Sequence, residues 1–372
     1  MTGTVLVVGA SGLVGSAAAE RFAGAGWDVV AVSRRRVEIP GVRWRPLDLL
    51  DAEACAAAAG DLTGVTHVVY AALQEQPGLF AGWLDDELID RNARMARNLL
   101  GPLVASAPDL EHISLLHGTK AYGLHHPDLG TRGIHMPLRE RDPLRPHRNF
   151  YFEQEQYLRD LQSAGAGFAL TTFRPTFIYG TAAGANMNPL LPIVAYGVLS
   201  REIGEPLHFP GAFGDLIREA VDASLLADVL VWAAEAPDVD GEAFNVTNGD
   251  VFTWDGVWPV IAGWLGMEVG EQRPTLLADW VPRHAEQWAA MVDRQGAGTP
   301  PDIVDHIGGN SLVYADLVLG SALHLAGAPR PDPIVNSTIK LRQAGFAGCL
   351  DTADMFATLV DRVLSTWGFA PP

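Results

Sequence analysis

The sequence predicts an α/β fold in which helices cover both faces of a parallel sheet, followed by a smaller, mainly helical C-terminal lobe. Short apolar runs rich in valine alternate with helical segments as far as about Gly180, which is typical of strands joined by crossover helices. The first run, Thr4 to Val8, leads directly into the glycine-rich segment Gly9 to Gly15. Beyond about residue 180 the alternation stops. Together these observations indicate a doubly wound sheet of the Rossmann type.

The segment from Gly9 to Gly15 is predicted to be a tight turn between a strand and a helix. Its G-x-x-G-x-x-G spacing is the short-chain dehydrogenase form of the dinucleotide-binding turn. Glycines let the backbone turn sharply, let a pyrophosphate approach, and let the following helix, Ser16 to Ala23, pack close to the strand. An ordinary glycine-rich β-α turn is the alternative. The residues expected to contact the dinucleotide are Gly9, Ser11, Gly12, Leu13, Val14 and Gly15.

The residues after the second predicted strand, Trp27 to Val32, favour NADPH over NADH as the cofactor. Ser33, Arg34 and Arg35 follow this strand, where an NAD-binding protein would carry an acidic residue for the ribose hydroxyls. Guanidinium groups bind phosphate through paired hydrogen bonds, so these arginines suit a 2′-phosphate. A solvated basic loop is the alternative interpretation.

Two further strand ends complete the predicted cofactor edge of the sheet. The third strand, around Val42 to Leu47, is followed by Asp48 and Leu49, and we expect the aspartate to contact the adenine amino group. The fourth strand ends in Ala71 and Ala72, whose small side chains would let a cofactor pass over the sheet.

The later part of the chain is predicted to be mostly helical. Helices are expected over 186–200, 222–234, 254–265 and 275–292, with a late strand at 244–247. We therefore expect residues 1–180 to form the NADP-binding core, with residues of about 215–250 returning to it, and 181–372 to form mainly a substrate-binding lobe. The cleft between core and lobe is the expected place for the active site.

Composition and charge exclude several classes of function. The formal charge of −18 opposes binding to nucleic acid, because phosphate backbones require a basic surface. No apolar run reaches membrane-spanning length and the N-terminus leads straight into a strand, so we expect a cytoplasmic protein with no membrane partner. Cys55 and Cys349 lie far apart without ligand spacing, and the histidines have no metal-binding spacing, so we expect no metal site.

Two segments contain the residues expected to perform the chemistry. The fifth strand, His112 to Leu116, delivers Lys120 at its carboxyl end, and the segment Asn149 to Tyr151 opens a helix that continues to about residue 164. When hydride reaches a carbonyl or an enone, negative charge develops on oxygen. A phenol can donate to that oxygen, and a nearby ammonium can stabilise the charge. The alternatives are a core-packing tyrosine and a surface lysine.

These motifs resemble those of the progesterone 5β-reductase and iridoid synthase-like group, atypical extended short-chain dehydrogenases that reduce enones with NADPH. The similarity runs along most of the chain, through GASGLVG, VSRR, THVVYAA, NARMARNLL, HISLLHGTKAYG, NFYFEQEQ, FRPTFIYG and STIKLRQAGF. Ordinary short-chain dehydrogenases carry a lysine four residues after the tyrosine, where this chain has Glu155. In the group it resembles, a G-T-K segment supplies the lysine, which matches Lys120. The group often has a second tyrosine where this chain has Phe152.

The resemblance implies a reaction and further site residues. Hydride would pass from NADPH to the β-carbon of an α,β-unsaturated carbonyl, and the enolate oxygen would lie against the Tyr151 hydroxyl. Lys120 would favour the anionic form by its charge and lower the pKa of Tyr151. Arg174 and Pro175 are expected on a loop after a sixth strand, along the nicotinamide. The further cofactor residues are Gly118, Arg174, Pro175, Phe177 and Ile178, and the residues of an apolar substrate pocket are Tyr122, Asn186, Met187 and Phe213.

The sequence leaves other functions open. The expected partner is a small apolar enone or enal, and a homodimer is compatible with the apolar helices. The enzymatic alternatives are 1,2-reduction of a carbonyl and epimerisation of a nucleotide sugar, the second being disfavoured by Glu155 and by the tryptophan-rich lobe. The non-enzymatic alternative is an NADPH-binding redox sensor, which would tolerate loss of Lys120 or Tyr151.

Overall fold

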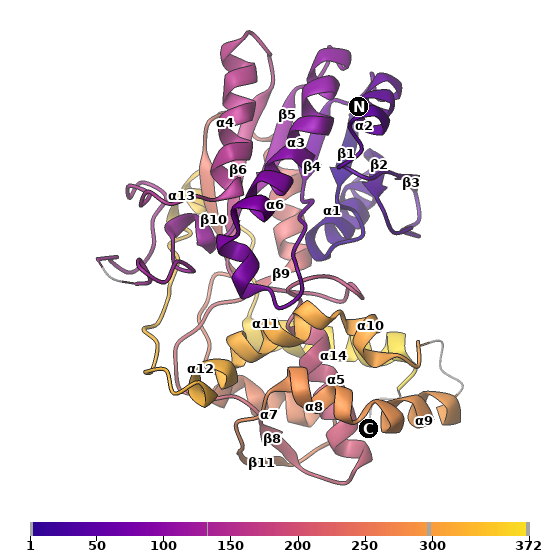
Figure 1. The fold of residues 1–372 in the computed structure, drawn as a ribbon, viewed down its shortest axis with the longest axis vertical. Coiled ribbons are helices and arrows are strands. Elements are labelled where there is room, and N and C mark those ends of the chain that lie inside the picture. The colour runs from indigo at the N-terminus through magenta and orange to yellow at the C-terminus, as the bar shows by residue number, and fades with distance from the viewer. Residues whose placement is uncertain (1–2, 132, 296–298, 370–372) are drawn as a thin grey trace.

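The structure, a computed structural model, describes residues 3–131, 133–295 and 299–369. Within these ranges the chain forms a seven-stranded parallel sheet covered by helices, and a mainly helical lobe lies at one end of the sheet (Figure 1). This arrangement confirms the predicted α/β class. No helix in the same ranges is long and apolar enough to cross a membrane.

The sheet reverses its winding direction at its centre. Its strands are β1 (Thr4–Val8), β2 (Asp28–Ser33), β3 (Val42–Pro46), β4 (His67–Tyr70), β5 (His112–Leu116), β6 (Ala169–Pro175) and β10 (Ala243–Val246). They lie in the order β10-β6-β5-β4-β1-β2-β3, and every neighbouring pair is parallel. The reversal falls between β1 and β4. Ligands of doubly wound sheets bind beyond the carboxyl ends of the strands at this point.

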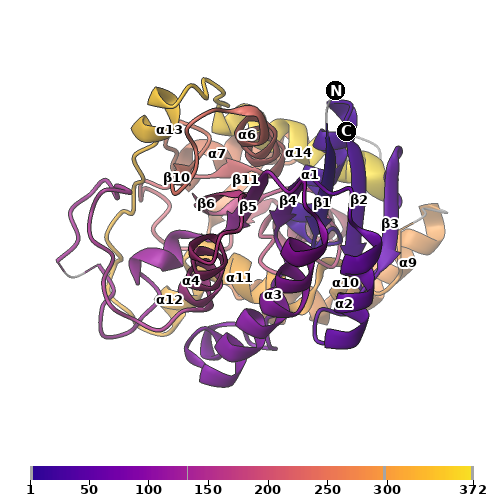
Figure 2. The ribbon, with the colours of Figure 1, turned by 90° about the horizontal axis from the view of Figure 1, so that it is seen from above.

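Helices cover both faces of the sheet because its strands are apolar on both sides. The covering helices are α1 (Leu13–Gly24), α2 (Ala52–Asp61), α3 (Asp86–Ser106), α4 (Phe150–Ser163) and α6 (Ala223–Glu235). In β1, Val5 and Val7 pack with α1 and α6, whereas Leu6 and Val8 pack with α2, α3 and α4. Figure 2 shows α2, α3 and α4 together on one side of the sheet and α6 on the other.

The C-terminal lobe has an apolar core of its own, rich in tryptophan. Its elements are α5 (Leu190–Glu202), β8 (Leu207–Phe209), α7 (Trp254–Trp264), β11 (Val269–Gln272), α8 (Leu277–Arg283), α9 (Ala285–Gln295), α10 (Ile303–Ile307), α11 (Gly309–Leu319), α12 (Ser321–Leu325) and α14 (Thr352–Trp367). Trp254 and Trp288 are fully buried there. The short strands β7 (Ile178–Tyr179) and β9 (Val221–Asp222) pair where the chain leaves the sheet for the lobe and returns to it. A last short helix, α13 (Ile339–Gln343), packs back against β10.

Two predicted helices of the lobe differ from the observed ones. The helix predicted from residue 186 begins at Leu190, because Met187 has a positive φ of 55° and the Asn188 side chain accepts from the Leu190 amide at 3.2 Å. A left-handed residue and a side chain that binds its own turn both disfavour an earlier helix start. The single helix predicted over 275–292 is two helices, α8 and α9, which are separated at His284, where the amide donates to the Val281 carbonyl at 3.0 Å instead of continuing the α-helical pattern.

A substitution at Gly15 tests the packing of α1 against the turn before it. A Cβ atom on Gly15 would lie 2.2 Å from the Gly9 carbonyl oxygen, a backbone atom that cannot move aside. We expect Gly15→Ala to lower the free energy of unfolding by about 1–3 kcal/mol. Gly24→Ala, at the other end of the same helix, meets no atom within 4 Å and should be neutral or stabilising by up to about 1 kcal/mol. Urea unfolding measures both, and equal effects would contradict the close contact.

Candidate active site

The predicted glycine turn lies at the carboxyl end of β1. Gly9 has a φ of +86°, and its amide donates to the Val32 carbonyl of β2 at 2.9 Å. A Cβ atom on Gly9 would lie 2.7 Å from the Cα of Ala72, so only glycine lets the turn approach the end of β4 this closely. Gly12 is the N-cap of α1 and has no side chain to cap the helix, so the first amides of α1 are free to donate to a bound anion.

Ser33, Arg34 and Arg35 lie at the end of β2, beside the glycine turn. The Ser33 hydroxyl accepts from the Trp44 indole at 3.0 Å and donates to the Arg35 carbonyl at 2.6 Å, which fixes the loop backbone. Both arginines are exposed, and Arg35 donates to the Ser11 carbonyl at 2.9 Å. The guanidinium of Arg35 therefore reaches the glycine turn.

Of the other two strand ends named from the sequence, the end of β3 lies beside that of β2, and the end of β4 lies beside the glycine turn. Asp48 is exposed and Leu49 is buried just after β3. Ala71 and Ala72 are half-buried just after β4, and the Ala71 amide donates to the Val8 carbonyl at 2.9 Å. The backbone of Ala71 and Ala72 packs closely against Gly9, where the sheet reverses.

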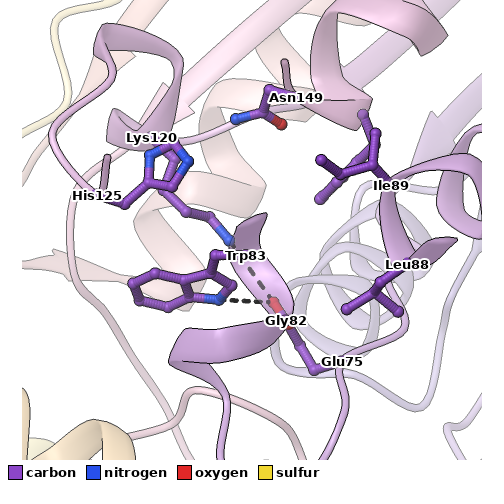
Figure 3. Close-up of a pocket in the computed structure, with 9 residues that line it drawn as sticks. Glu75, Gly82, Trp83, Leu88, Ile89, Lys120, His125 and Asn149 are labelled. Atoms are coloured by element: carbon purple, nitrogen blue, oxygen red, sulfur yellow. Dashed lines mark hydrogen bonds and ion pairs between the residues drawn. The ribbon is translucent and has the colours of Figure 1, made fainter. Parts of the chain in front are cut away.

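Lys120 lies in a small, largely enclosed cavity at the carboxyl end of β5 (Figure 3). The short 3-10 helix η2 (Thr119–Tyr122) bears it. Its Nζ is 3.6 Å from Oε1 of Glu75 and 4.4 Å from the ring centre of Trp83, a residue of the 3-10 helix η1 (Phe80–Leu84). The Trp83 indole donates to the same Glu75 oxygen at 3.3 Å. Sequence reasoning missed both partners, although Glu75 follows a strand end just as Lys120 does.

Tyr151 opens α4 next to this cavity. Asn149 is the N-cap of the helix, and its side chain accepts from the Tyr151 amide at 3.1 Å. The Tyr151 ring stacks on His117, with ring centres 4.8 Å apart and planes inclined by 14°, and the Lys120 Nζ lies 5.8 Å from the Tyr151 ring centre. A Cβ atom on Gly118 would lie 3.2 Å from the Tyr151 hydroxyl, so this hydroxyl lies close to the Gly118 backbone. The fold thus brings the tyrosine and the lysine together from separate segments.

Burial controls the charges of the cluster formed by Lys120, Glu75, Tyr151 and His117. Burial lowers the pKa of Lys120 and raises the pKa of Glu75, and each residue opposes the shift of the other. Burial also raises the pKa of Tyr151, and Glu75 adds to the shift, so the predicted lowering by Lys120 is wrong. Burial lowers the pKa of His117 to about 3, and Arg174 adds to the shift, so the ring stacked on Tyr151 is neutral at pH 7.

Glu155 occupies the position at which ordinary short-chain dehydrogenases carry a lysine. One carboxylate oxygen accepts from Arg159, one turn further along α4, at 2.6 Å, and the other lies 4.0 Å from Nε2 of His117. Glu155 is therefore part of an ion pair on α4, and the lysine of this site comes from η2 instead.

Arg174 and Pro175 lie within β6, not on the predicted loop after it, because they pair with Asn245 and Val246 of β10. Arg174 is buried and donates to the Tyr122 hydroxyl at 3.3 Å, and that hydroxyl donates to the Asn245 side chain at 2.7 Å. The Tyr122 hydroxyl, expected in a substrate pocket, is therefore engaged in a network that joins η2, β6 and β10.

Phe177 and Ile178 lie at the junction of sheet and lobe. Ile178 belongs to β7, and the Phe177 ring packs near Tyr314 of α11, with ring centres 6.0 Å apart. Tyr314 lies close enough to Tyr151 to contribute to the rise in its pKa. Sequence reasoning missed Tyr314, because no local pattern distinguishes it from the other aromatic residues of the lobe.

The remaining predicted pocket residues lie in turns of the lobe. Asn186 is exposed, and its side chain accepts from Asn310 at 3.4 Å. Met187 and Phe213 are half-buried and have positive φ angles of 55° and 57°. The Phe213 ring packs near His324, with ring centres 6.0 Å apart.

The parallel sheet, the glycine turn at its reversal point and the adjacent tyrosine and lysine define an enzyme of the extended short-chain dehydrogenase class that uses a nicotinamide dinucleotide. Comparison with known proteins agrees, since residues 5–247 match the NAD dependent epimerase/dehydratase family. The fold is also similar to the crystal structure of a putative epimerase from Burkholderia cenocepacia, with a TM-score of 0.66, 20% identity and 98% of each chain covered.

Curated relatives place the chain more closely. It is 30% identical to the (S)-8-oxocitronellyl enol synthase of Nepeta cataria, over 96% of this chain and 91% of that protein. It is 27% identical to the 3-oxo-Delta(4,5)-steroid 5-beta-reductase of Arabidopsis thaliana, over 96% of this chain and 90% of that protein. The chain belongs to the NAD dependent epimerase/dehydratase family and, within it, to the progesterone 5β-reductase and iridoid synthase-like group. The resemblance drawn from the sequence is confirmed.

The Tyr122 network yields a stability prediction. Tyr122→Phe removes the donor to Asn245 and the acceptor for the buried Arg174 guanidinium. Leaving these buried groups unpaired should lower the free energy of unfolding by about 1–3 kcal/mol, as measured by urea unfolding. Unchanged stability together with weaker substrate binding would instead place the Tyr122 hydroxyl in the substrate pocket.

Proposed function

We propose that the protein is an NADPH-dependent reductase that transfers hydride to the β-carbon of an α,β-unsaturated carbonyl. The observation that carries the proposal is the approach of the Lys120 Nζ to within 5.8 Å of the Tyr151 ring centre, while Glu155 holds the position of the ordinary lysine. The names of the relatives support it, since one is an enol synthase and another a steroid 5-beta-reductase. We expect a small apolar enone or enal as substrate.

The residues at the reversal point of the sheet fit the proposed cofactor. Neither Gly9 nor Gly15 has room for a Cβ atom, and the exposed Arg34 and Arg35 follow the neighbouring strand. In the proposal, the turn and the first amides of α1 hold the pyrophosphate, and the arginines hold the 2′-phosphate that distinguishes NADPH from NADH. When bound, NADPH supplies the hydride.

Tyr151 provides the hydrogen bond to the substrate oxygen. Because burial raises the pKa of its hydroxyl, the phenol keeps its proton at neutral pH and acts as a donor. A donor fixed in a buried site stabilises a developing enolate oxygen more strongly than water does. The phenol need not give up its proton, since solvent can protonate the α-carbon afterwards.

Lys120 provides positive charge beside the same oxygen. Its ammonium lies 4.4 Å from the Trp83 ring centre and 5.9 Å from that of Phe150, and aromatic faces favour a cation. Leu88 and Ile89 line the small cavity around the lysine, and these apolar neighbours would strengthen the attraction between the ammonium and an enolate.

The loss of the Tyr151 hydroxyl tests the proposal. NADPH oxidation is followed with 2-cyclohexen-1-one and progesterone, and products are identified by mass spectrometry and NMR. The wild type should give saturated ketones, and Tyr151→Phe should lower kcat by about 10²-fold or more while NADPH still binds. Tyr157→Phe, half-buried on the same helix, is the control and should keep its activity. Alcohols as sole products would contradict enone reduction, and NADPH binding without any turnover would favour a sensor.

Replacing the arginines after β2 tests the choice of cofactor. Arg34→Ala combined with Arg35→Ala should weaken NADPH binding by roughly 10- to 100-fold, the value of charge-assisted hydrogen bonds to phosphate, with little change for NADH. Arg36→Ala is the control, because Arg36 is exposed and pairs with Glu38 at 3.2 Å. Calorimetry measures both dinucleotides, and equal losses for the two would refute the 2′-phosphate assignment.

A further inference from the structure

Glu75 is a buried carboxylate that none of the sequence motifs includes. Its side chain is 1% exposed, and it lies in the loop between β4 and η1. Burying a carboxylate costs several kcal/mol unless a partner compensates. The groups that contact Glu75 must therefore offset the cost of burying its charge.

The carboxylate, the indole and the ammonium form a closed triangle (Figure 3). Oε1 of Glu75 accepts from the Trp83 indole at 3.3 Å and lies 3.6 Å from the Lys120 Nζ. The Trp83 ring in turn faces the ammonium at 4.4 Å. Each member therefore restrains the other two, and the lysine side chain has a defined direction.

We propose that Glu75 is the positioning residue of this site: its carboxylate, fixed by Trp83, holds the Lys120 ammonium charged and directed toward the ring of Tyr151. The inference rests on the proposed function, because it explains how the lysine of that reaction is oriented. In ordinary short-chain dehydrogenases the helix of the tyrosine carries the lysine. Here the lysine comes from η2, and the carboxylate that it contacts comes from the loop between β4 and η1.

The surroundings of Lys120 leave Glu75 as its source of negative charge. The cavity is lined by Glu75, Gly82, Trp83, Leu88, Ile89, His125, Asn149 and Phe150, and Glu75 is the one acidic residue in this described set. Burial lowers the pKa of His125 to about 3, with Lys120 adding to the shift, and burial raises the pKa of Tyr151, so both are neutral at pH 7. His147 contacts the main-chain carbonyl of Lys120 at 3.1 Å.

The sign of the expected pH effect follows from this environment. Burial lowers the pKa of Lys120, and Glu75 opposes that shift. Removing the carboxylate should lower the pKa further, so that Lys120 loses its charge at a lower pH. Activity that depends on the ammonium should then fall at a lower pH in the variant, and the alkaline limb of the pH profile should move toward neutrality.

The sequence allows this charge to be measured without any turnover. Lys120 and Lys340 are the two lysines of the chain, so labelling lysine with ¹³C at Cε gives two resonances, which Lys340→Arg assigns. In Glu75→Gln the amide oxygen can still accept from Trp83, but the negative charge is gone. We expect the pKa of Lys120 to fall in Glu75→Gln, with the Lys340 resonance as the internal reference.

The kinetic arm uses the same variant with two comparisons. Glu75→Gln should lower kcat for the enone about tenfold or more, change the KM for NADPH little, and shift the alkaline limb to lower pH. Glu75→Asp keeps the charge with a shorter reach and should recover the position of this limb and part of kcat. Glu153→Gln, on α4, makes the same chemical change where the carboxylate faces Arg97 and Arg148, and should behave as wild type.

The outcomes separate this inference from the proposed function. A Lys120 titration and a pH profile that stay unchanged in Glu75→Gln would overturn the inference even if the wild type reduces enones. A lowered pKa of Lys120 in a protein that turns over no enone would support the positioning role and remove the proposed function. Thermal unfolding of each variant shows that the comparison is made on folded protein.

Discussion

The parallel register of β1, β4 and β5 fixes where each group of the site begins. Val8 pairs with Tyr70, and Tyr70 pairs with Leu115. The glycine turn starts directly after Val8, Glu75 follows Tyr70 by five residues, and Lys120 follows Leu115 by five residues. A slip of β5 by one residue would turn its side chains to the opposite face and part the lysine from its carboxylate. Strand pairing therefore determines which side chains lie close together in the site.

The site combines one compensated charge pair with neutral aromatic groups. Burial disfavours the charged form of every titratable side chain in the cluster, and Lys120 and Glu75 offset this cost by pairing with each other. Tyr151 and the His117 ring stacked on it stay neutral. The result is a positive charge beside a fixed neutral donor, in apolar surroundings. In the proposed reaction, the ammonium and the neutral donor would together stabilise a developing enolate.

The features of this molecule that depend on a single segment could be predicted from the sequence. Most features that depend on contacts between distant segments could not. Strand alternation and glycine spacing predicted the sheet and the turn, and the bounds of β5 agree with the sequence interpretation. Lys120 and Tyr151 could be chosen because one follows a strand and the other begins a helix. Glu75 and Trp83 could not, since their contacts with Lys120 join two separate connections of the sheet, and the path from Glu75 to Trp83 includes a residue with positive φ, Leu79. The direction of the pKa shift of Tyr151 could not be predicted from the local sequence either, because burial in the folded protein determines it.

The position of a deuterium label tests the central claim most directly. The protein is supplied with NADPH deuterated at C4 and with 2-cyclohexen-1-one, and the product is examined by NMR. The account predicts cyclohexanone with deuterium at the carbon β to the carbonyl. Deuterium on the carbinol carbon of the allylic alcohol would contradict it, because hydride would then have reached the carbonyl carbon and no enolate would have formed.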